Sequence, residues 1–297
     1  MYFDMPTAYG ATSKDDSIRS KSRSGGMFTI ISDYILERRG VVFGCRLNDE
    51  FEAVHTACTS KKERDALCGS KYVQSSMDNC FRLAKQYLDE DIFVLFSGTS
   101  CQIKGLKNYL GKDYKKLLLV DILCHGVPSP AIWHDYLKWQ MAQHEVNVKK
   151  VSFRNKTDFG WKSHIETIYF EDGTRVDSHL FTDLFYEHNI LRPCCYECKF
   201  KKFIHPGDIT LGDFWEIINI DPEYNDNKGL SLVLLNTQKG ADVFNSIKDR
   251  INFKKYEAVK TFRKSMLNPF PCPPGRKMFW EKYLSNGFEA CVKNEKR

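Results

Sequence analysis

Two stretches of the chain decide the expected fold: IFVLFSGTSC at residues 92–101 and LLLVDILC at residues 117–124. Each is a short apolar run typical of a buried strand, and each is followed by a cysteine and then by a helical pattern. Two such strand-turn-helix units predict parallel strands, so Cys101 and Cys124 would project from the same edge of one sheet. Ligands bind at that edge in open α/β sheets, and helix N-termini stabilise thiolates. We therefore expect both thiols to be ligands.

The remaining patterns predict a mixed α/β (α+β) fold: a core sheet with flanking helices and strand-turn-helix units, plus a smaller antiparallel β lobe. Core helices are expected at Met27–Arg38, Ser76–Leu88, Gln102–Leu110 and from Pro130, and core strands at Val41–Cys45, Ala53–Ala57, Ile92–Phe96 and Leu117–Leu123. The lobe is expected to begin near residue 145, with strands at Lys150–Phe153, His164–Phe170 and Thr174–Asp177.

The ends of the chain carry weaker patterns. Residues 1–26 end in a flexible turn before the helical pattern at Met27–Arg38, and we assign no element to them. Ile209–Leu211 and Leu230–Leu235 are expected to return to a sheet, and the prolines within residues 269–274 predict a strap across the surface before a final helix. We divide the chain into an N-terminal α/β region, residues 1–145, and a C-terminal α/β region, residues 146–297, packed as one unit.

Composition narrows the class of protein. With 297 residues, 42% of them hydrophobic, the chain can bury a large core. A net charge of +6 without a long basic run argues against a nucleic-acid partner. No stretch resembles a signal peptide or a membrane span, which predicts a cytoplasmic protein. In that compartment, the eleven cysteines are expected to be thiols or ligands rather than disulfides.

The pair Cys195-x-x-Cys198 supplies two further candidate ligands. Such a pair is found in dithiol redox sites, zinc sites and iron-sulfur sites. Its context looks like a loop, unlike a thioredoxin-type helix start. Four thiolates gathered from three loops favour a 4Fe-4S cluster, with zinc and purely structural thiols as the alternatives. The spacing leaves open whether Cys194 or Cys195 is the ligand.

Three other features are weaker. Ser24, Gly25 and Gly26 precede a helix, as in anion-binding turns, although such turns are commoner than phosphate sites. The loop GSKYVQS (69–75) offers a lysine, an aromatic ring and polar donors, but a solvated loop is its default interpretation. His125, beside Cys124, is either a proton donor near the site or a hydrogen-bonding residue of the turn.

Together these segments resemble the coenzyme F-420 hydrogenase/dehydrogenase beta-subunit family. The similar blocks are SRSGG (22–26), GSKYVQS (69–75), FSGTSCQ (96–102), VDILCHGVPSP (120–130), RPCCYEC (192–198) and GDITLGDFW (207–215), in that order. They extend over nearly the whole chain, which makes the match specific.

The resemblance implies an oxidoreductase subunit that holds FAD and a 4Fe-4S cluster, passes electrons between them, and exchanges a hydride with a small molecule or coenzyme. It implies that residues 1–145 bind FAD and the cluster. Within that site, His125 is our candidate catalytic residue because of its position beside Cys124. Its implied cluster ligands are Cys101, Cys124, Cys195 and Cys198, and its implied FAD-binding residues are Ser24, Gly25, Gly26, Lys71, Tyr72, Gln74 and Ser75.

Two departures from the family modify this expectation. Many relatives begin with a ferredoxin-like segment, which this chain lacks before Tyr9, so we expect either a separate ferredoxin-type partner or a chain that is a fragment or a diverged relative. Ser100 stands where the family usually has proline, which leaves the Cys101 thiol in place. The alternative is a zinc-bound or cofactor-free binding protein derived from the family, for instance in a surface-polysaccharide pathway. A homo-oligomer is compatible with either.

Overall fold

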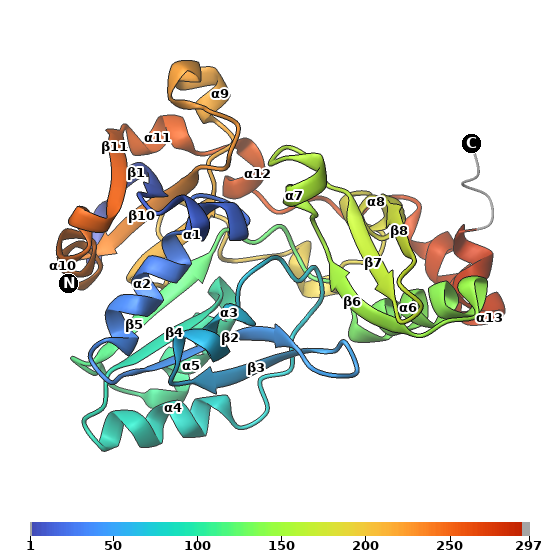
Figure 1. Cartoon of the computed structure of the whole chain (residues 1–297), viewed down its shortest axis with the longest axis horizontal. Coiled ribbons are helices and arrows are strands. Elements are labelled where there is room, and N and C mark those ends of the chain that lie inside the picture. Colours follow the sequence, from blue (N-terminus) through green and yellow to red (C-terminus); the bar gives the residue numbers. More distant parts are fainter. Residues whose placement is uncertain (1, 293–297) are drawn as a thin grey trace.

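An eight-stranded mixed sheet forms the centre of the computed structural model, which describes residues 2–292 (Figure 1). Strands β2, β4, β5 and β9 are parallel neighbours, and antiparallel strands extend the sheet at both sides. In order across the sheet, the strands are β11 (Ile251–Tyr256), β1 (Tyr2–Ser13), β10 (Ser231–Thr237), β9 (Ile209–Asp213), β5 (Leu117–Ile122), β4 (Val94–Thr99), β2 (Val41–Leu47) and β3 (Ala53–Cys58). The predicted mixed α/β core is confirmed.

Helices bury both faces of this sheet. Leu95 of β4 packs into the same core as α2 (Met27–Leu36) and α10 (Gln238–Ser246). Its neighbours Val94 and Phe96 pack on the opposite face, against α4 (Cys80–Asp89) and α5 (Ser100–Leu110). Burial on both faces explains why this strand is a continuous apolar run. The short helix α1 (Asp16–Lys21) contacts β1, and the short helix α3 (Lys61–Asp65) contacts α2.

The predicted antiparallel lobe is also confirmed. Strands β6 (Val148–Ser152), β7 (Glu166–Phe170) and β8 (Arg175–Ser178) form a three-stranded sheet, at the right in Figure 1. Helices α6 (Pro130–His144), α8 (Leu180–Tyr186) and α13 (Arg276–Val292) share a core with this sheet. The chain leaves the main sheet after β5, builds most of this lobe, and returns at β9.

Strand β1 is the main difference from the sequence-based expectation. No element was assigned to residues 2–13 from the sequence, yet they pair with β10 on one side and β11 on the other. The buried positions of β1 are filled by small or polar side chains, such as Ala8, Ala11 and Thr12, so its sequence lacks an apolar signal. Neighbouring strands therefore determine this element, and local propensity does not.

The remaining segments are short. They comprise helices α7 (Lys156–Phe159), α9 (Ile217–Ile220), α11 (Ala258–Thr261) and α12 (Lys264–Leu267), and 3-10 turns at Pro193–Cys195, Pro222–Tyr224 and Lys248–Arg250. The proline-rich residues 268–275 have almost no regular structure and lead into α13. Within residues 2–292, no helix is long and apolar enough to cross a membrane.

Candidate functional site

The predicted ligand cysteines gather beyond the carboxyl ends of β4 and β5. Cys101 lies in the first turn of α5, and Cys124 follows two residues after β5. Burial, assisted by the nearby thiols of Cys101 and Cys195, raises the pKa of Cys124 to about 12. Three segments distant in sequence therefore place their thiols within electrostatic reach of one another.

Gly126 allows two of these segments to approach closely. Its φ is +146°, and a Cβ at this position would lie 2.8 Å from Cδ1 of Leu191 and 3.5 Å from Cβ of Cys195. The Arg192 N–H donates to the Val127 carbonyl over 2.9 Å, which ties the segments together. A side chain at position 126 would press on the buried side chain of Leu191, while its contact with Cys195 would be an ordinary van der Waals one.

The segment that carries Cys195 and Cys198 also brings a positive charge, that of Lys201, close to the thiols. Cys195 is half-buried and lies within electrostatic reach of Cys124, whereas Cys194 is exposed. Burial raises the pKa of Cys195 to about 11. Burial lowers the pKa of Lys201, while Cys124, Cys198 and Cys195 oppose that shift. Lys201 thus brings a positive charge to three thiols, where it would stabilise thiolates.

As the side chains stand, the described residues contain no group of three or more His, Cys, Asp or Glu that could hold a metal ion. Cys101 and Cys195 lie within electrostatic reach of Cys124, and Cys198 lies within reach of Cys195.

A buried polar network holds the ends of β4 and β5, from which the loops with Cys101 and Cys124 start. Asp121 of β5 is fully buried and accepts hydrogen bonds from Ser100 Oγ and Thr210 Oγ1, both over 2.6 Å. His205 Nδ1 lies 2.9 Å from the same carboxylate. Sequence analysis missed this hub, although an aspartate inside the run LLLVDIL was a signal, because a buried carboxylate needs partners. Ser100, the departure from the family pattern, is therefore part of a specific network.

His125 lies in a cluster of rings beside the thiols. Its Nε2 lies 2.8 Å from Nε2 of His188, and its ring contacts Tyr186 and Phe270 with centroid distances of 4.9 and 4.3 Å. Burial, assisted by the charge of Lys201, lowers the pKa of His125 to about 3. Phe270 belongs to the predicted proline-rich strap, which thus covers this part of the site.

The loop at residues 71–75 connects directly to both cysteine loops. Ser75 Oγ accepts a hydrogen bond from Gln102 Nε2 over 2.9 Å, and Gln102 Oε1 accepts one from the Thr99 N–H over 2.9 Å. Thr99 Oγ1 in turn lies 3.1 Å from Cys101 Sγ. On the other side, the Gln74 N–H donates to a carbonyl in the turn that follows Cys124, at a distance of 3.1 Å.

Lys71 and Tyr72 have internal partners. Lys71 Nζ donates to the carbonyls of Leu67 and Cys68, over 2.9 and 2.8 Å, just beyond α3. Burial lowers its pKa. The Tyr72 ring stacks on Phe185 with a centroid distance of 4.8 Å. The lysine therefore stabilises a helix end, while the tyrosine joins the rings near the thiols.

The turn at residues 24–26 lies at a different part of the main sheet. Ser24 Oγ donates to the Leu230 carbonyl over 2.6 Å, and the Gly25 N–H donates to Ser231 Oγ over 2.9 Å. A Cβ on Gly25 would overlap a backbone oxygen of β1. Gly26 caps α2 with a φ of +90°. These glycines let the turn pack against the sheet, and several of their polar groups are already bonded there.

A continuous series of ring contacts runs from Trp161 to His125, which lies beside the thiols. His125 contacts Tyr186, Tyr186 contacts His164, and His164 stacks on Trp215, at centroid distances of 4.9, 5.0 and 5.9 Å. Trp215 stacks on Trp161 at 4.6 Å and 10°. We call these five residues the ring band. Only His125 and Trp215 were noted in the sequence, because the other rings join them through tertiary contacts.

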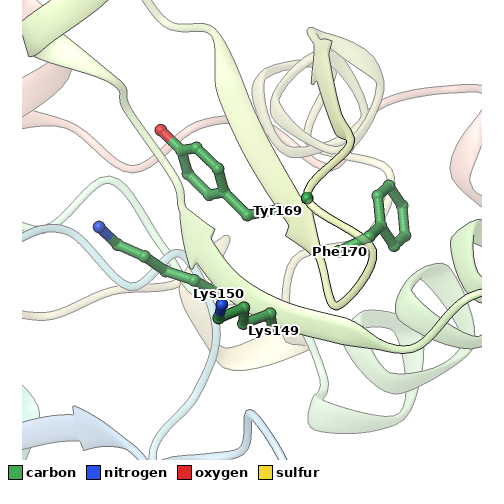
Figure 2. Close-up of a pocket in the computed structure, with 5 residues that line it drawn as sticks. Lys149, Lys150, Tyr169 and Phe170 are labelled. Carbon is green, nitrogen blue, oxygen red and sulfur yellow. The ribbon is translucent and has the colours of Figure 1, made fainter.

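A separate pocket lies on the small sheet (Figure 2). It is lined by Lys149, Lys150, Tyr169, Phe170 and Gly173. Tyr169 and Phe170 point to opposite sides of β7, and Lys150 Nζ lies 5.4 Å from the Tyr169 ring centroid. None of the predicted ligand or cofactor residues lines this pocket, so the candidate site is the region around the thiols.

Comparison with known proteins agrees with this arrangement. Residues 93–259 match the family model for the C terminus of the beta subunit of coenzyme F-420 hydrogenase/dehydrogenase, and residues 8–81 match the model for its N-terminal part. No curated protein matches the chain. A similar solved structure is a chain of the F-420-reducing nickel-iron hydrogenase complex from Methanosarcina barkeri, with a TM-score of 0.61 and 16% identity over 95% of this chain and 93% of that one.

At that identity the solved structure shows a shared fold, while the family models show the relationship. The C-terminal model alone spans more than half of the 297 residues and includes all the predicted cysteine ligands. The N-terminal model includes the turn at residues 24–26 and the loop at residues 71–75. The chain therefore belongs to the coenzyme F-420 hydrogenase/dehydrogenase beta-subunit family, a family of oxidoreductase subunits.

Proposed function

We propose that this protein is an iron-sulfur flavoprotein oxidoreductase subunit, in which Cys101, Cys124, Cys195 and Cys198 hold a 4Fe-4S cluster and FAD binds beside it. The observation that carries the proposal is the gathering of thiols from three segments around Cys124. When bound, the cluster would handle single electrons and the flavin would handle hydride pairs.

The donor set fits a cluster. Crowding and burial keep the free thiols of Cys124 and Cys195 protonated, with pKa values of about 12 and 11. Binding iron would replace those protons and relieve the repulsion among the thiolates, while Lys201 supplies a compensating charge. Each cysteine of a four-iron cluster binds a different iron, so its thiols need not meet at a single point.

Several features support a flavin next to these thiols. Tyr72, Gln74 and Ser75 lie in the loop that hydrogen bonds toward both cysteine loops. Lys71 is already used at the end of α3, so its proposed contribution is to position this loop. Ser24, Gly25 and Gly26 lie at the start of α2 and would serve the opposite end of a long ligand.

His125 is proposed as a catalytic residue that holds its ring proton and hydrogen bonds to a bound group. Its low pKa, about 3, keeps the ring neutral at physiological pH, so it is too weak a base to take up a second proton there. A neutral imidazole can donate at one nitrogen and accept at the other, so its proposed contribution is to orient a bound hydride carrier. The hydrogen bond to His188 would set which nitrogen carries the proton.

The partners are proposed by chemical class. Electrons would be exchanged with a separate ferredoxin-type protein, and hydride with a small molecule or coenzyme. We propose the cytoplasm as the working compartment, because reduced thiols persist there.

Anaerobic purification followed by iron, sulfide and flavin analysis tests the proposal. We expect flavin absorption bands, a broad shoulder near ~400 nm and about four irons per chain. Cys198→Ser should lose most of its iron, because it removes a proposed ligand. Cys291→Ser is the matched control, since this half-buried thiol on α13 donates to the backbone carbonyls of Phe279 and Gly287 in the same helix.

Equal iron loss in both variants would refute the ligand assignment. Zinc without acid-labile sulfide in the wild-type protein would favour the binding-protein alternative.

A further inference from the structure

Arg23 is a cation with unused hydrogen-bond donors. Of the three guanidinium nitrogens, Nη2 donates to the backbone carbonyls of Trp161 and Ser163. The other two, Nε and Nη1, are shielded from solvent and have no hydrogen-bond partner among the described residues. Leaving donors of a charged group buried and unbonded is costly, so such a group calls for a missing partner.

A second arginine occupies the same place. Arg154 donates to the same carbonyls as Arg23, to Ser163 over 3.2 Å through Nε and to Trp161 over 3.2 Å through Nη2. Two guanidinium groups therefore share two backbone oxygens and lie close to each other. Arg154 is also paired with Asp213, at 2.6 Å, and this carboxylate neutralises it.

Lys156 adds a further positive charge. Its Nζ donates to the backbone carbonyls of Arg19 and Ser22, over 2.8 and 2.9 Å, on the segment that leads to Arg23. Burial lowers the pKa of Lys156 to about 8, and the charge of Arg19 contributes to the shift. Arg19 is itself paired with Asp226 at 2.6 Å.

The charges at this junction do not balance. Both carboxylates are used in ion pairs with Arg19 and Arg154. Neither Arg23 nor Lys156 pairs with a carboxylate within residues 2–292, and two positive charges remain in excess. His164, next to Ser163, also has a buried Nδ1 without a partner in this part of the chain. The junction therefore offers excess positive charge and unbonded donors together.

We infer that Arg23, Arg154 and Lys156 form a binding site for a phosphoryl anion, with Arg23 as its main donor. A phosphoryl group carries several acceptor oxygens, and the free Nε and Nη1 of Arg23, which point to different sides of the guanidinium, would each donate a charged hydrogen bond to one of them. The ring band provides the link to the thiols, because Arg154 lies over Trp215 at 5.1 Å and the band continues to His125.

Under the proposed function, the occupant of this site is the diphosphate of FAD, with the flavin ring at the end of the ring band next to the thiols. The identity of the occupant rests on that function, whereas the anion site rests on the charges alone. The nearby turn at residues 24–26 would then border the same diphosphate.

Binding of FAD, riboflavin and inorganic pyrophosphate to the purified full-length protein tests the inference. Arg23→Gln should weaken FAD binding about 10- to 100-fold, the effect of one lost charged hydrogen-bond pair, and leave riboflavin binding unchanged. Pyrophosphate should raise the unfolding temperature of the wild-type protein and not that of Arg23→Gln. The matched control is Arg82→Gln, at an exposed arginine on α4. Lys156→Gln removes the second excess charge and should weaken FAD binding in the same direction.

The outcomes separate the two proposals. FAD binding that is equally tight in the wild-type protein and in both variants would overturn the anion site. Pyrophosphate stabilisation that depends on Arg23, in a protein that binds neither flavin, would support the anion site and refute the flavin function. Absence of both flavin binding and pyrophosphate stabilisation in the wild-type protein would refute both.

Discussion

The substitution Asp121→Asn tests whether the buried network below the thiols holds the cysteine loops in place. The Asp121 carboxylate accepts hydrogen bonds from Ser100, Thr210 and His205. Each hydrogen bond to a buried charge contributes about 1.5–3 kcal/mol to the free energy of unfolding. An asparagine keeps one acceptor oxygen and turns an NH2 group toward the other donors. His205 could accept from that group only by moving its proton to Nε2, which is buried without a partner among residues 2–292. One interaction must fail, which predicts a loss of about 3 kcal/mol in the free energy of unfolding.

The assay is urea unfolding followed by tryptophan fluorescence, together with the iron content of anaerobically purified protein. Asp113→Asn, at an exposed position between α5 and β5, removes the same charge and should leave both measurements unchanged. Iron content should fall in Asp121→Asn, because Ser100 adjoins Cys101 and the loop loses its support. A stability within about 1 kcal/mol of the wild-type protein would refute the reasoning, since the network would then contribute little.

Two further predictions concern the site's surroundings. Gly126→Ala should destabilise the fold by about 1–3 kcal/mol and reduce iron content, because its Cβ would lie 2.8 Å from Leu191 Cδ1. The control is Gly173→Ala, because Gly173 also has a positive φ but a Cβ there would have no neighbour within 4 Å. An iron content that falls in Gly126→Ala and stays unchanged in Gly173→Ala would isolate the steric effect. His55 has a pKa lowered to about 4 by burial, so the unfolded chain binds its proton first as the pH falls below about 6.5. The wild-type protein should therefore lose about 3 kcal/mol more than His55→Gln between pH 7 and pH 4 in equilibrium unfolding, and equal losses would contradict this assignment.

The sequence predicted the elements whose signals are local. Strands β4 and β5 were found because burial on both faces makes them continuous apolar runs. The hairpin of β7 and β8 was found because its strands alternate around a turn of Glu171, Asp172 and Gly173. Strand β1 was missed because Ala8, Ala11 and Thr12 give no such signal, and its partners β10 and β11 lie more than 200 residues away in the sequence.

The candidate site was predictable to the same limited degree. Each of Cys101 and Cys124 follows a recognisable strand, so their common edge follows from chain order alone. The arrival of the Cys195 segment beside them could not be predicted, since it depends on contacts of Gly126 with Leu191. The assignment of these cysteines as cluster ligands stays a prediction, as does the assignment of the FAD-binding residues.

The sequence by itself determined the class of fold, the two strand-turn-helix units and the sheet edge at which the first thiols lie, because periodicity and turn chemistry act over a few neighbouring residues. Only the tertiary structure decided which distant groups share a space. It brought His205 to Asp121, Ser75 to Gln102 and Arg23 to Arg154. These pairings follow from the packing of whole sheets and loops, and hydrogen bonding and charge compensation between residues far apart in the chain leave no local pattern.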